Sequence, residues 1–123
     1  MAVVRAMIRY RSNGRATIVL EGEIDLSTAP SVQTALATCR ARKATDIDVD
    51  LTAVSFCDAS GPNVFIAASR HAAAEEGDVR LHHLAPVVRL LLDVTGTGYL
   101  LTGRHPDGQA SRDSARQASS GAP

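Results

Sequence analysis

The amino-acid sequence predicts an α/β fold: a single domain with one mixed β-sheet of four to five strands and helices packed against it. Its 123 residues suffice for one domain with a buried core, but not for a cofactor domain beside a substrate domain. Strand-like and helix-like patterns follow in the order strand, strand, helix, strand, helix, strand, helix, strand. This order favours parallel pairing of strands joined by a helix, because each crossover lays its helix on the sheet.

The first two strands are predicted to form an antiparallel hairpin. Residues 3–10 alternate imperfectly between apolar and polar side chains, and residues 16–20 are rich in β-branched ones. The run Ser12-Asn13-Gly14 between them is a turn signal. The second strand is expected to end within residues 20–25.

A helix is predicted next, opened by Ser27-Thr28-Ala29-Pro30, where a hydroxyl caps the first turn and proline is tolerated. Its apolar residues recur at helical spacing, at Val32, Ala35, Leu36 and Cys39. Residues 46–51 then carry the clearest strand pattern of the chain. Asp-Ile-Asp-Val-Asp-Leu alternates strictly, so its three apolar side chains share one face.

The second half of the domain predicts two helices with a strand between them. The second helix spans about residues 61–76 and is closed by Gly77, and the strand covers residues 78–84. The third helix opens at Pro86 and stops at Gly96. The second helix is expected to turn Val64, Ala67, Ala68, His71 and Ala72 inward, and the third carries Val87, Leu90, Leu91 and Val94 at helical spacing.

The composition changes after Thr102 to small and polar residues with few large apolar ones. Such a segment cannot offset the entropy of ordering it. We therefore expect a domain at residues 1–103, with a short last strand at Tyr99-Leu100-Leu101, and a disordered tail at residues 104–123.

Charge and residue usage argue against several classes of function. Cationic and acidic side chains balance at 13 each with no block of like charge, so no nucleic-acid partner is expected. No leader and no run of about 18 apolar residues is visible, which predicts a soluble cytoplasmic protein without a membrane partner. Cys39 and Cys57 are interpreted as small hydrophobic residues rather than redox partners. The pair His82-His83 lacks further residues at ligand spacing, so neither a metal nor a cofactor is expected.

The run Phe56-Cys57-Asp58-Ala59-Ser60-Gly61-Pro62 joins the third strand to the second helix. It places a carboxylate and a hydroxyl where a helix begins. The first turn of a helix has unpaired N–H groups and positive dipole charge, so a hydroxyl there is well placed to carry a phosphate. An enzyme is not expected, because the chain lacks nucleophile-elbow and phosphate-loop motifs and His71 lies about three helical turns from Ser60.

Three stretches, in the same order, resemble the STAS domain and specifically the small free-standing anti-sigma factor antagonists. They are Leu-x-Gly-Glu-Ile-Asp at residues 20–25, Phe-x-Asp-x-Ser-Gly at residues 56–61, and the stretch from Pro86 to Gly96. The similarity covers roughly residues 3–102.

The resemblance implies a partner-switching protein. The unphosphorylated antagonist binds an anti-sigma factor that is also a serine kinase, and so releases a sigma factor for transcription. The kinase, with its own ATP and magnesium, phosphorylates the antagonist and ends the binding, and a separate phosphatase restores it. The resemblance also implies a loop with Glu23 and Asp25 beside the central motif. The implied partner-binding residues are Glu23, Asp25, Asp58, Ser60, Gly61 and Pro62.

One departure from the family pattern leaves the phosphorylation site open. The family carries its phosphate on the serine directly after the aspartate, and that position here is Ala59, which cannot accept a phosphoryl group. Ser60 is either the acceptor or a helix cap that accepts a backbone N–H bond. Asp58 either orients the acceptor and contacts the partner, or is a second capping carboxylate. Ala59, with Pro62 where the family tends to have leucine, favours an alternative hypothesis: a constitutive, non-phosphorylated binding or sensor module in a larger assembly.

Overall fold

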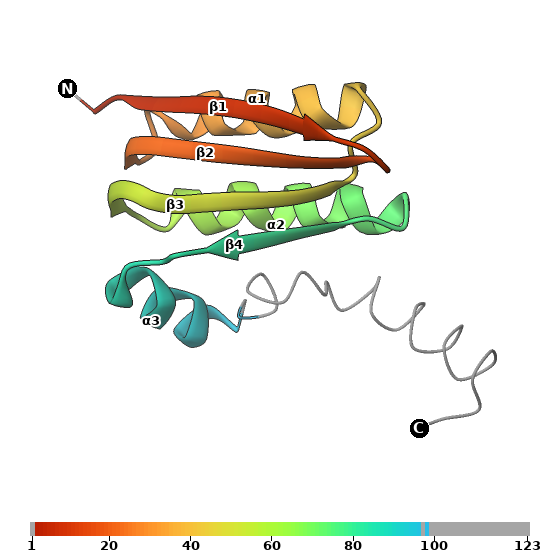
Figure 1. The fold of residues 1–123 in the computed structure, drawn as a ribbon. Coiled ribbons are helices and arrows are strands. Elements are labelled where there is room, and N and C mark those ends of the chain that lie inside the picture. Colours follow the sequence, from red (N-terminus) through yellow and green to blue (C-terminus); the bar gives the residue numbers. More distant parts are fainter. Residues whose placement is uncertain (1, 97, 99–123) are drawn as a thin grey trace.

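A four-stranded mixed sheet carries the fold, and α1 and α2 pack on one of its faces (Figure 1). The computed structural model describes residues 2–96 and 98, except the side chains of Val87 and Thr95. The elements are β1 (Val4–Arg11), β2 (Arg15–Ile24), α1 (Ala29–Ala41), β3 (Asp46–Cys57), α2 (Ser60–Ala74), β4 (Asp78–His82) and α3 (Pro86–Thr95). The predicted α/β class and mixed sheet are confirmed. The strand predicted at residues 99–101 and the tail at residues 104–123 lie outside the described residues.

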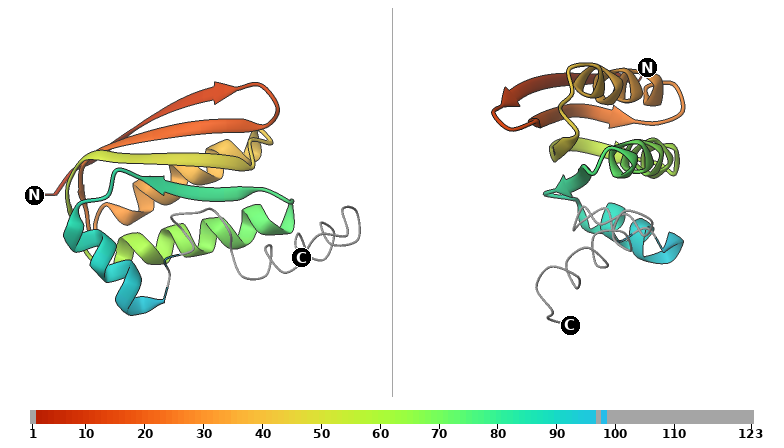
Figure 2. Two further views of the ribbon diagram at one scale, coloured as in Figure 1. Left: turned by 60° about the horizontal axis from the view of Figure 1, so that its bottom comes forward. Right: turned by 90° about the vertical axis from the view of Figure 1, so that its right-hand side faces the viewer.

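The strand order is β1-β2-β3-β4, with the first pair antiparallel and the other two pairs parallel. The predicted hairpin is present, and its turn places Asn13 and Gly14 at φ 65° and 72°, the left-handed conformations that tight hairpin turns require. In the view from the side, α1 and α2 both lie on the same side of the sheet (Figure 2). The carboxyl ends of β2 and β3 are therefore neighbours at one edge of the sheet, where α1 and α2 begin.

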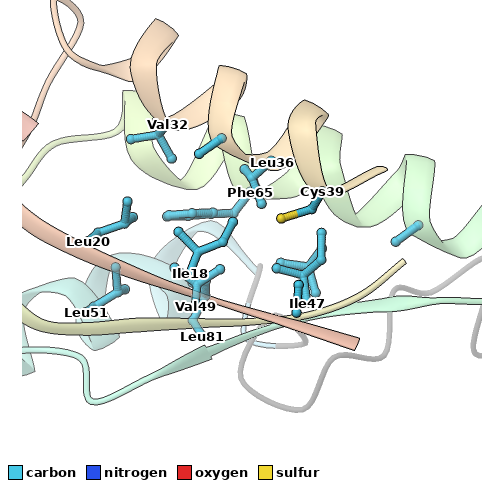
Figure 3. Close-up of a cluster of buried hydrophobic side chains, with 14 of the residues drawn as sticks. Ile18, Leu20, Val32, Leu36, Cys39, Ile47, Val49, Leu51, Phe65 and Leu81 are labelled. Atoms are coloured by element: carbon cyan, nitrogen blue, oxygen red, sulfur yellow. The ribbon is translucent and has the colours of Figure 1, made fainter. Parts of the chain in front are cut away.

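The core fills the space between this helical layer and the sheet (Figure 3). Alternate residues of the parallel strands are buried, as period-2 patterns require. They are Ala16, Ile18 and Leu20 on β2, Ile47, Val49 and Leu51 on β3, and Val79 and Leu81 on β4. From the helices, Val32, Leu36 and Cys39 of α1 and Phe65 of α2 pack onto them. The faces predicted for the third strand and for the first helix are confirmed.

The buried faces of the other two helices differ from the prediction. Helix α2 buries Phe65 and Ser69 together with Ala72, whereas Ala67 and His71 are exposed. The buried stripe of α2 includes the polar Ser69 and only one large apolar side chain, Phe65, so the spacing of apolar residues does not mark it. The buried Ser69 hydroxyl donates to the Ile66 carbonyl at 2.9 Å.

Helix α3 buries Val88 and Leu92, while Leu90 and Val94 are 60% and 75% exposed. It lies beyond the β4 end of the sheet rather than over its middle (Figure 1), so only a narrow stripe of the helix is covered. Its end is as predicted, since Gly96 takes the left-handed conformation with φ 72°.

The predicted hydroxyl cap of α1 is wrong. The Thr28 hydroxyl turns back toward the strand, accepting from the Asp25 N–H at 2.9 Å and donating to the Glu23 carbonyl at 2.7 Å. The Asp25 carboxylate forms the hydrogen bond at the start of the helix instead, accepting from the Thr28 N–H at 3.0 Å. Glu23 itself lies within β2, which ends at Ile24, and not in a loop after the strand.

Helix α2 ends at Ala74, and Glu76 rather than Gly77 takes the left-handed conformation, with φ 62°. Gly77 is needed for a different reason, because a Cβ at that position would overlap the Thr45 carbonyl oxygen. Strand β4 stops at His82, two residues before the predicted end. His83 at φ 61° turns the chain out of the extended conformation.

The face of the sheet opposite the helices, here called the open face, is polar. It consists of Arg5, Met7, Arg9 and Arg11 of β1, Arg15, Thr17, Val19 and Glu21 of β2, Asp46, Asp48 and Asp50 of β3, and Asp78, Arg80 and His82 of β4. Asp48 is at the centre of the side-chain hydrogen bonds on the open face. The Asp48 carboxylate binds Arg80 Nε at 2.9 Å, His82 Nε2 at 2.8 Å and one Arg15 nitrogen at 3.4 Å.

We expect Asp48 to make stability depend on pH in the acid range. Partial burial opposes its ionisation, but the bonds from Arg80 and His82, the Arg80 charge and the Arg15 bond outweigh this and lower the Asp48 pKa to about 2. Since the folded-state pKa lies below the unfolded value of 3.8, the stabilisation is present above about pH 4 and is lost as the pH falls through about 2. We expect it to amount to about 1 to 2 kcal/mol.

Urea unfolding at about pH 6 and about pH 2.5 measures this contribution in the wild type and in Asp48→Asn. The other carboxylates titrate in both proteins. The difference between wild type and Asp48→Asn in how the free energy of unfolding depends on pH is therefore due to Asp48. Stability should fall less on acidification in Asp48→Asn than in the wild type. Equal losses in the two proteins would refute a role for Asp48.

Candidate functional site

Strand pairing brings two loops together at the carboxyl ends of β2 and β3. Glu23 pairs with Phe56 and Ile24 pairs with Cys57, and the Asp58 N–H donates to the Ile24 carbonyl at 3.0 Å. The two chain segments, residues 23–28 and residues 56–62, are here called the paired-loop surface. The structure thus places the central motif beside the segment of Glu23 and Asp25.

In the central loop, the Asp58 carboxylate holds Ser60. Asp58 Oδ1 accepts from the Ser60 N–H at 2.8 Å and from the Ser60 hydroxyl. Ser60 is the first residue of α2, Ala59 is the cap position, and no side chain of the cap residue bonds to the first turn. The interpretation of Ser60 as a cap is therefore wrong, because Ser60 lies within the helix and its hydroxyl accepts no backbone N–H bond from the described residues. Asp58 both binds a first-turn N–H and orients the Ser60 hydroxyl.

The neighbouring loop repeats this geometry with Asp25 and Ser27. Asp25 Oδ1 accepts from the Ser27 hydroxyl at 2.6 Å, from the Ser27 N–H at 2.9 Å and from the Thr28 N–H at 3.0 Å. The Ser27 hydroxyl bond, aided by the backbone bonds and opposed by desolvation, lowers the Asp25 pKa. Ser27 was not predicted from the sequence, although a signal was present: an Asp-x-Ser triplet follows each of the two neighbouring parallel strands.

Two exposed apolar side chains lie in the same segments and were also missed. Leu26 is 81% exposed and Phe56 is 51% exposed. Leu26 is the middle residue of its Asp-x-Ser triplet, as the exposed Ala59 is in the other, so both turns hold their middle residue in solvent. Exposed apolar side chains with polar groups around them are typical of a protein-binding surface.

Gly61 and Pro62, the last two residues of the second segment, are buried. A Cβ at position 61 would overlap Cys57 Sγ and would lie 3.3 Å from Ile24 Cγ2, so glycine lets α2 approach the ends of both strands. Burial, and to a lesser degree the Asp58 charge, raises the Cys57 pKa to about 11, and the thiol is protonated at neutral pH. Cys39 is fully buried, as the sequence predicted, and both thiols are free.

Other features of the described residues lie apart from this site. Within residues 2–96 and 98, no group of three or more His, Cys, Asp or Glu side chains is arranged to hold a metal ion. In the same part of the chain no helix is both long enough and apolar enough to cross a membrane. Arg40 and His71 help to line a hollow of about 100 Å³ between α1 and α2, to which the paired-loop residues contribute nothing.

Comparison with known families identifies the fold. The family model described as "Mlab, STAS domain" matches residues 8–102, which include both loops of the site. The chain belongs to the STAS domain family. The family resemblance predicted from the three sequence stretches is thereby confirmed.

Named relatives of this STAS domain come from two Listeria species. Anti-sigma-B factor antagonists of Listeria monocytogenes and Listeria innocua are each 28% identical to it over 108 residues, which is 88% of this chain and 95% of theirs. The crystal structure of an anti-sigma factor antagonist from Mycobacterium paratuberculosis superposes with a TM-score of 0.69 at 21% identity, over 89% of this chain and 93% of that one.

SpoIIAA, an anti-sigma factor antagonist whose structure is known in its unphosphorylated form, superposes with a TM-score of 0.63 at 21% identity, over 72% of this chain and 82% of its own. The phosphorylated form of the Bacillus cell fate determinant SpoIIAA gives 0.63 at 20% identity, over 88% of this chain and 98% of that one. These solved structures establish the shared fold of the STAS domain.

Proposed function

We propose that this STAS domain is a cytoplasmic anti-sigma factor antagonist, which binds an anti-sigma factor and so releases a sigma factor for transcription. The similarity to two named antagonists over 88% of the chain supports this role. The observation that carries the proposal is the paired-loop surface, where Asp25 and Asp58 hold their serines in the same way at the ends of adjacent strands. The protein acts by binding and not by catalysis.

The surface indicates the chemistry of its partner. Glu23, Asp25 and Asp58 make it acidic, and the exposed Leu26 and Phe56 supply apolar area. The complementary partner presents cationic side chains and N–H donors around an apolar pocket, since buried apolar anchors inside a polar rim give most protein interfaces their affinity. Gly61 and Pro62 support this surface from below.

The anti-sigma factor proposed is of the serine-kinase type, and Ser60 is the proposed phosphate acceptor. A phosphate on Ser60 adds about −1.5 to −2 charges next to Asp58 and removes the hydroxyl proton that Asp58 now accepts. Repulsion then breaks the Asp58–Ser60 turn and opposes docking of the partner. A phosphatase would restore the hydroxyl and the surface.

A second candidate function is a constitutive binding or sensor module that is not phosphorylated. Two observations favour it. The exposed middle position of the central Asp-x-Ser triplet is Ala59, which has no hydroxyl, and the Ser60 hydroxyl beside it is half-buried and bound to Asp58. A kinase would first have to separate Ser60 from Asp58.

Ser60→Asp should weaken binding to a serine-kinase anti-sigma factor of the same genome by about tenfold or more, because it adds charge beside Asp58. Isothermal titration measures the affinity, with Ser60→Ala as the uncharged control, which should bind within a few-fold of the wild type. Unchanged affinity of Ser60→Asp would show that the partner docks elsewhere on the domain.

Mass spectrometry separates the two candidate functions. After incubation with ATP and an anti-sigma factor that binds, the switch predicts a gain of about 80 Da that is located at Ser60 and absent from Ser60→Ala. Tight binding with no gain in mass would establish the constitutive module instead.

A further inference from the structure

The open face of the sheet is divided into a basic half and an acidic half. Three of the four outward residues of β1 and the first of β2 are arginines: Arg5, Arg9, Arg11 and Arg15. The outward residues of β3 and β4 include Asp46, Asp48, Asp50 and Asp78. Figure 1 looks onto this face with α1 and α2 behind the strands, and Figure 2 confirms that none of the described helices covers it.

The strand register places these charges in rows across the sheet. The first row reads Arg11, Arg15, Asp46, Asp78 from β1 to β4. The next row reads Arg9, Thr17, Asp48, Arg80, and the third reads Met7, Val19, Asp50, His82. The first row therefore changes sign between β2 and β3, whereas the second row also carries Arg80 on β4 and the third has its one carboxylate, Asp50, on β3.

Such a face is complementary to itself in one orientation. Consider two copies whose open faces pack against each other about a two-fold axis that runs parallel to the strands, level with the gap between β2 and β3. In this arrangement β1 packs on β4 of the second copy, and β2 packs on its β3. Arg11 then faces Asp78 of the second copy and Arg15 faces its Asp46, and each contact occurs twice. In the second row Arg9 faces Arg80 of the second copy, whose charge is offset by its ion pair with Asp48. A two-fold axis across the strands would instead lay β1 on β1 and oppose like charges.

We infer that the open face binds a second copy of this chain with the strands in this orientation. The formal net charge of zero leaves no overall repulsion between copies. Asp48 is already paired with Arg15, Arg80 and His82, and the carboxylates that face the arginines of the second copy are Asp46 and Asp78. Met7, which is 55% exposed, adds apolar area beside Val19 in the third row. The interface is mainly electrostatic and therefore sensitive to salt.

Sedimentation velocity of the full chain at about 10 to 500 µM tests the inference. Dimers should form at about 50 mM salt, and the dissociation constant should rise at least about tenfold at about 500 mM. A chain that stays monomeric throughout this range at low salt would overturn the proposal, as would a dimer that is insensitive to salt.

A charge-swap experiment tests the orientation. The basic-half variant is Arg11→Glu with Arg15→Glu, and the acidic-half variant is Asp46→Lys with Asp78→Lys. Each variant alone should lose self-association, because like charges then face each other twice. An equimolar mixture of the two should associate as the wild type does. Thermal unfolding of each variant shows that it is folded.

The matched control is Arg70→Glu with Arg89→Glu. It changes the net charge by the same amount as the basic-half variant, but its two positions are exposed on α2 and α3, away from the open face. It should dimerise like the wild type. When mixed with the acidic-half variant it should not form a mixed dimer. If it does, overall charge alone explains the attraction and the proposed orientation is wrong. Persistent dimers of the basic-half variant would also overturn the proposal, and would point to pairing along a sheet edge.

Discussion

Replacing Phe65 with alanine should lower the free energy of unfolding by about 3 to 5 kcal/mol. Phe65 is 1% exposed and is the largest of the fully buried side chains. It projects from α2 into the space between the helical layer and the sheet (Figure 3), where truncation removes apolar contacts and leaves a cavity. A loss of this size is a large part of the roughly 5 to 15 kcal/mol that stabilises an ordinary domain.

The chain offers a matched control, because its only other phenylalanine is Phe56. Phe56 is 51% exposed, so Phe56→Ala should change stability by no more than about 1 kcal/mol. It should instead weaken binding of the anti-sigma factor, if the paired-loop surface is the docking site. Urea unfolding of both variants makes the comparison. Equal losses of stability would contradict the packing described here.

Gly61→Ala should lower the free energy of unfolding by about 1 to 3 kcal/mol. The new methyl group would overlap Cys57 Sγ and press on Ile24, so α2 would have to move away from the strand ends. The effect runs against intrinsic helix preference, since alanine is otherwise the better helix former. A shifted α2 would also displace Ser60 from its place beside Asp58.

A double-mutant cycle identifies the cause of this loss. Cys57→Ala removes the sulfur atom that the new methyl group would strike, so Gly61→Ala should cost much less in a Cys57→Ala chain than in the wild type. The expected coupling is about 1 kcal/mol or more, measured by urea unfolding of the four proteins. If the two substitutions are simply additive, another contact requires glycine at position 61.

The elements with a clear local signal in the sequence were predicted correctly. The strict alternation of residues 46–51, the turn at Ser12-Asn13-Gly14 and the left-handed stop at Gly96 are all present in the structure. Each depends on a period or a backbone conformation that neighbouring residues determine. The buried faces of α2 and α3 were predicted less well, because the buried stripe of α2 includes the polar Ser69 and because α3 lies beside the sheet, where only a narrow stripe of it is covered.

The site was predicted in part. The central motif directed attention to Asp58 and Ser60, but the sequence left open whether the Ser60 hydroxyl accepts or donates a hydrogen bond. The structure shows that it donates to Asp58. The equivalent pair of Asp25 and Ser27 was not predicted, because its meaning depends on the two strands being neighbours.

The sequence by itself determined the α/β class, the order of the elements and the family, because these depend on local periodicity and on short motifs. Only the tertiary structure decided how the two Asp-x-Ser turns meet and how the charges of the open face divide. Residues 25 and 58 come together because β2 pairs with β3, and Arg11 lies level with Asp78 because four strands align in one register. Such relations join residues more than 30 positions apart, and no local pattern records them.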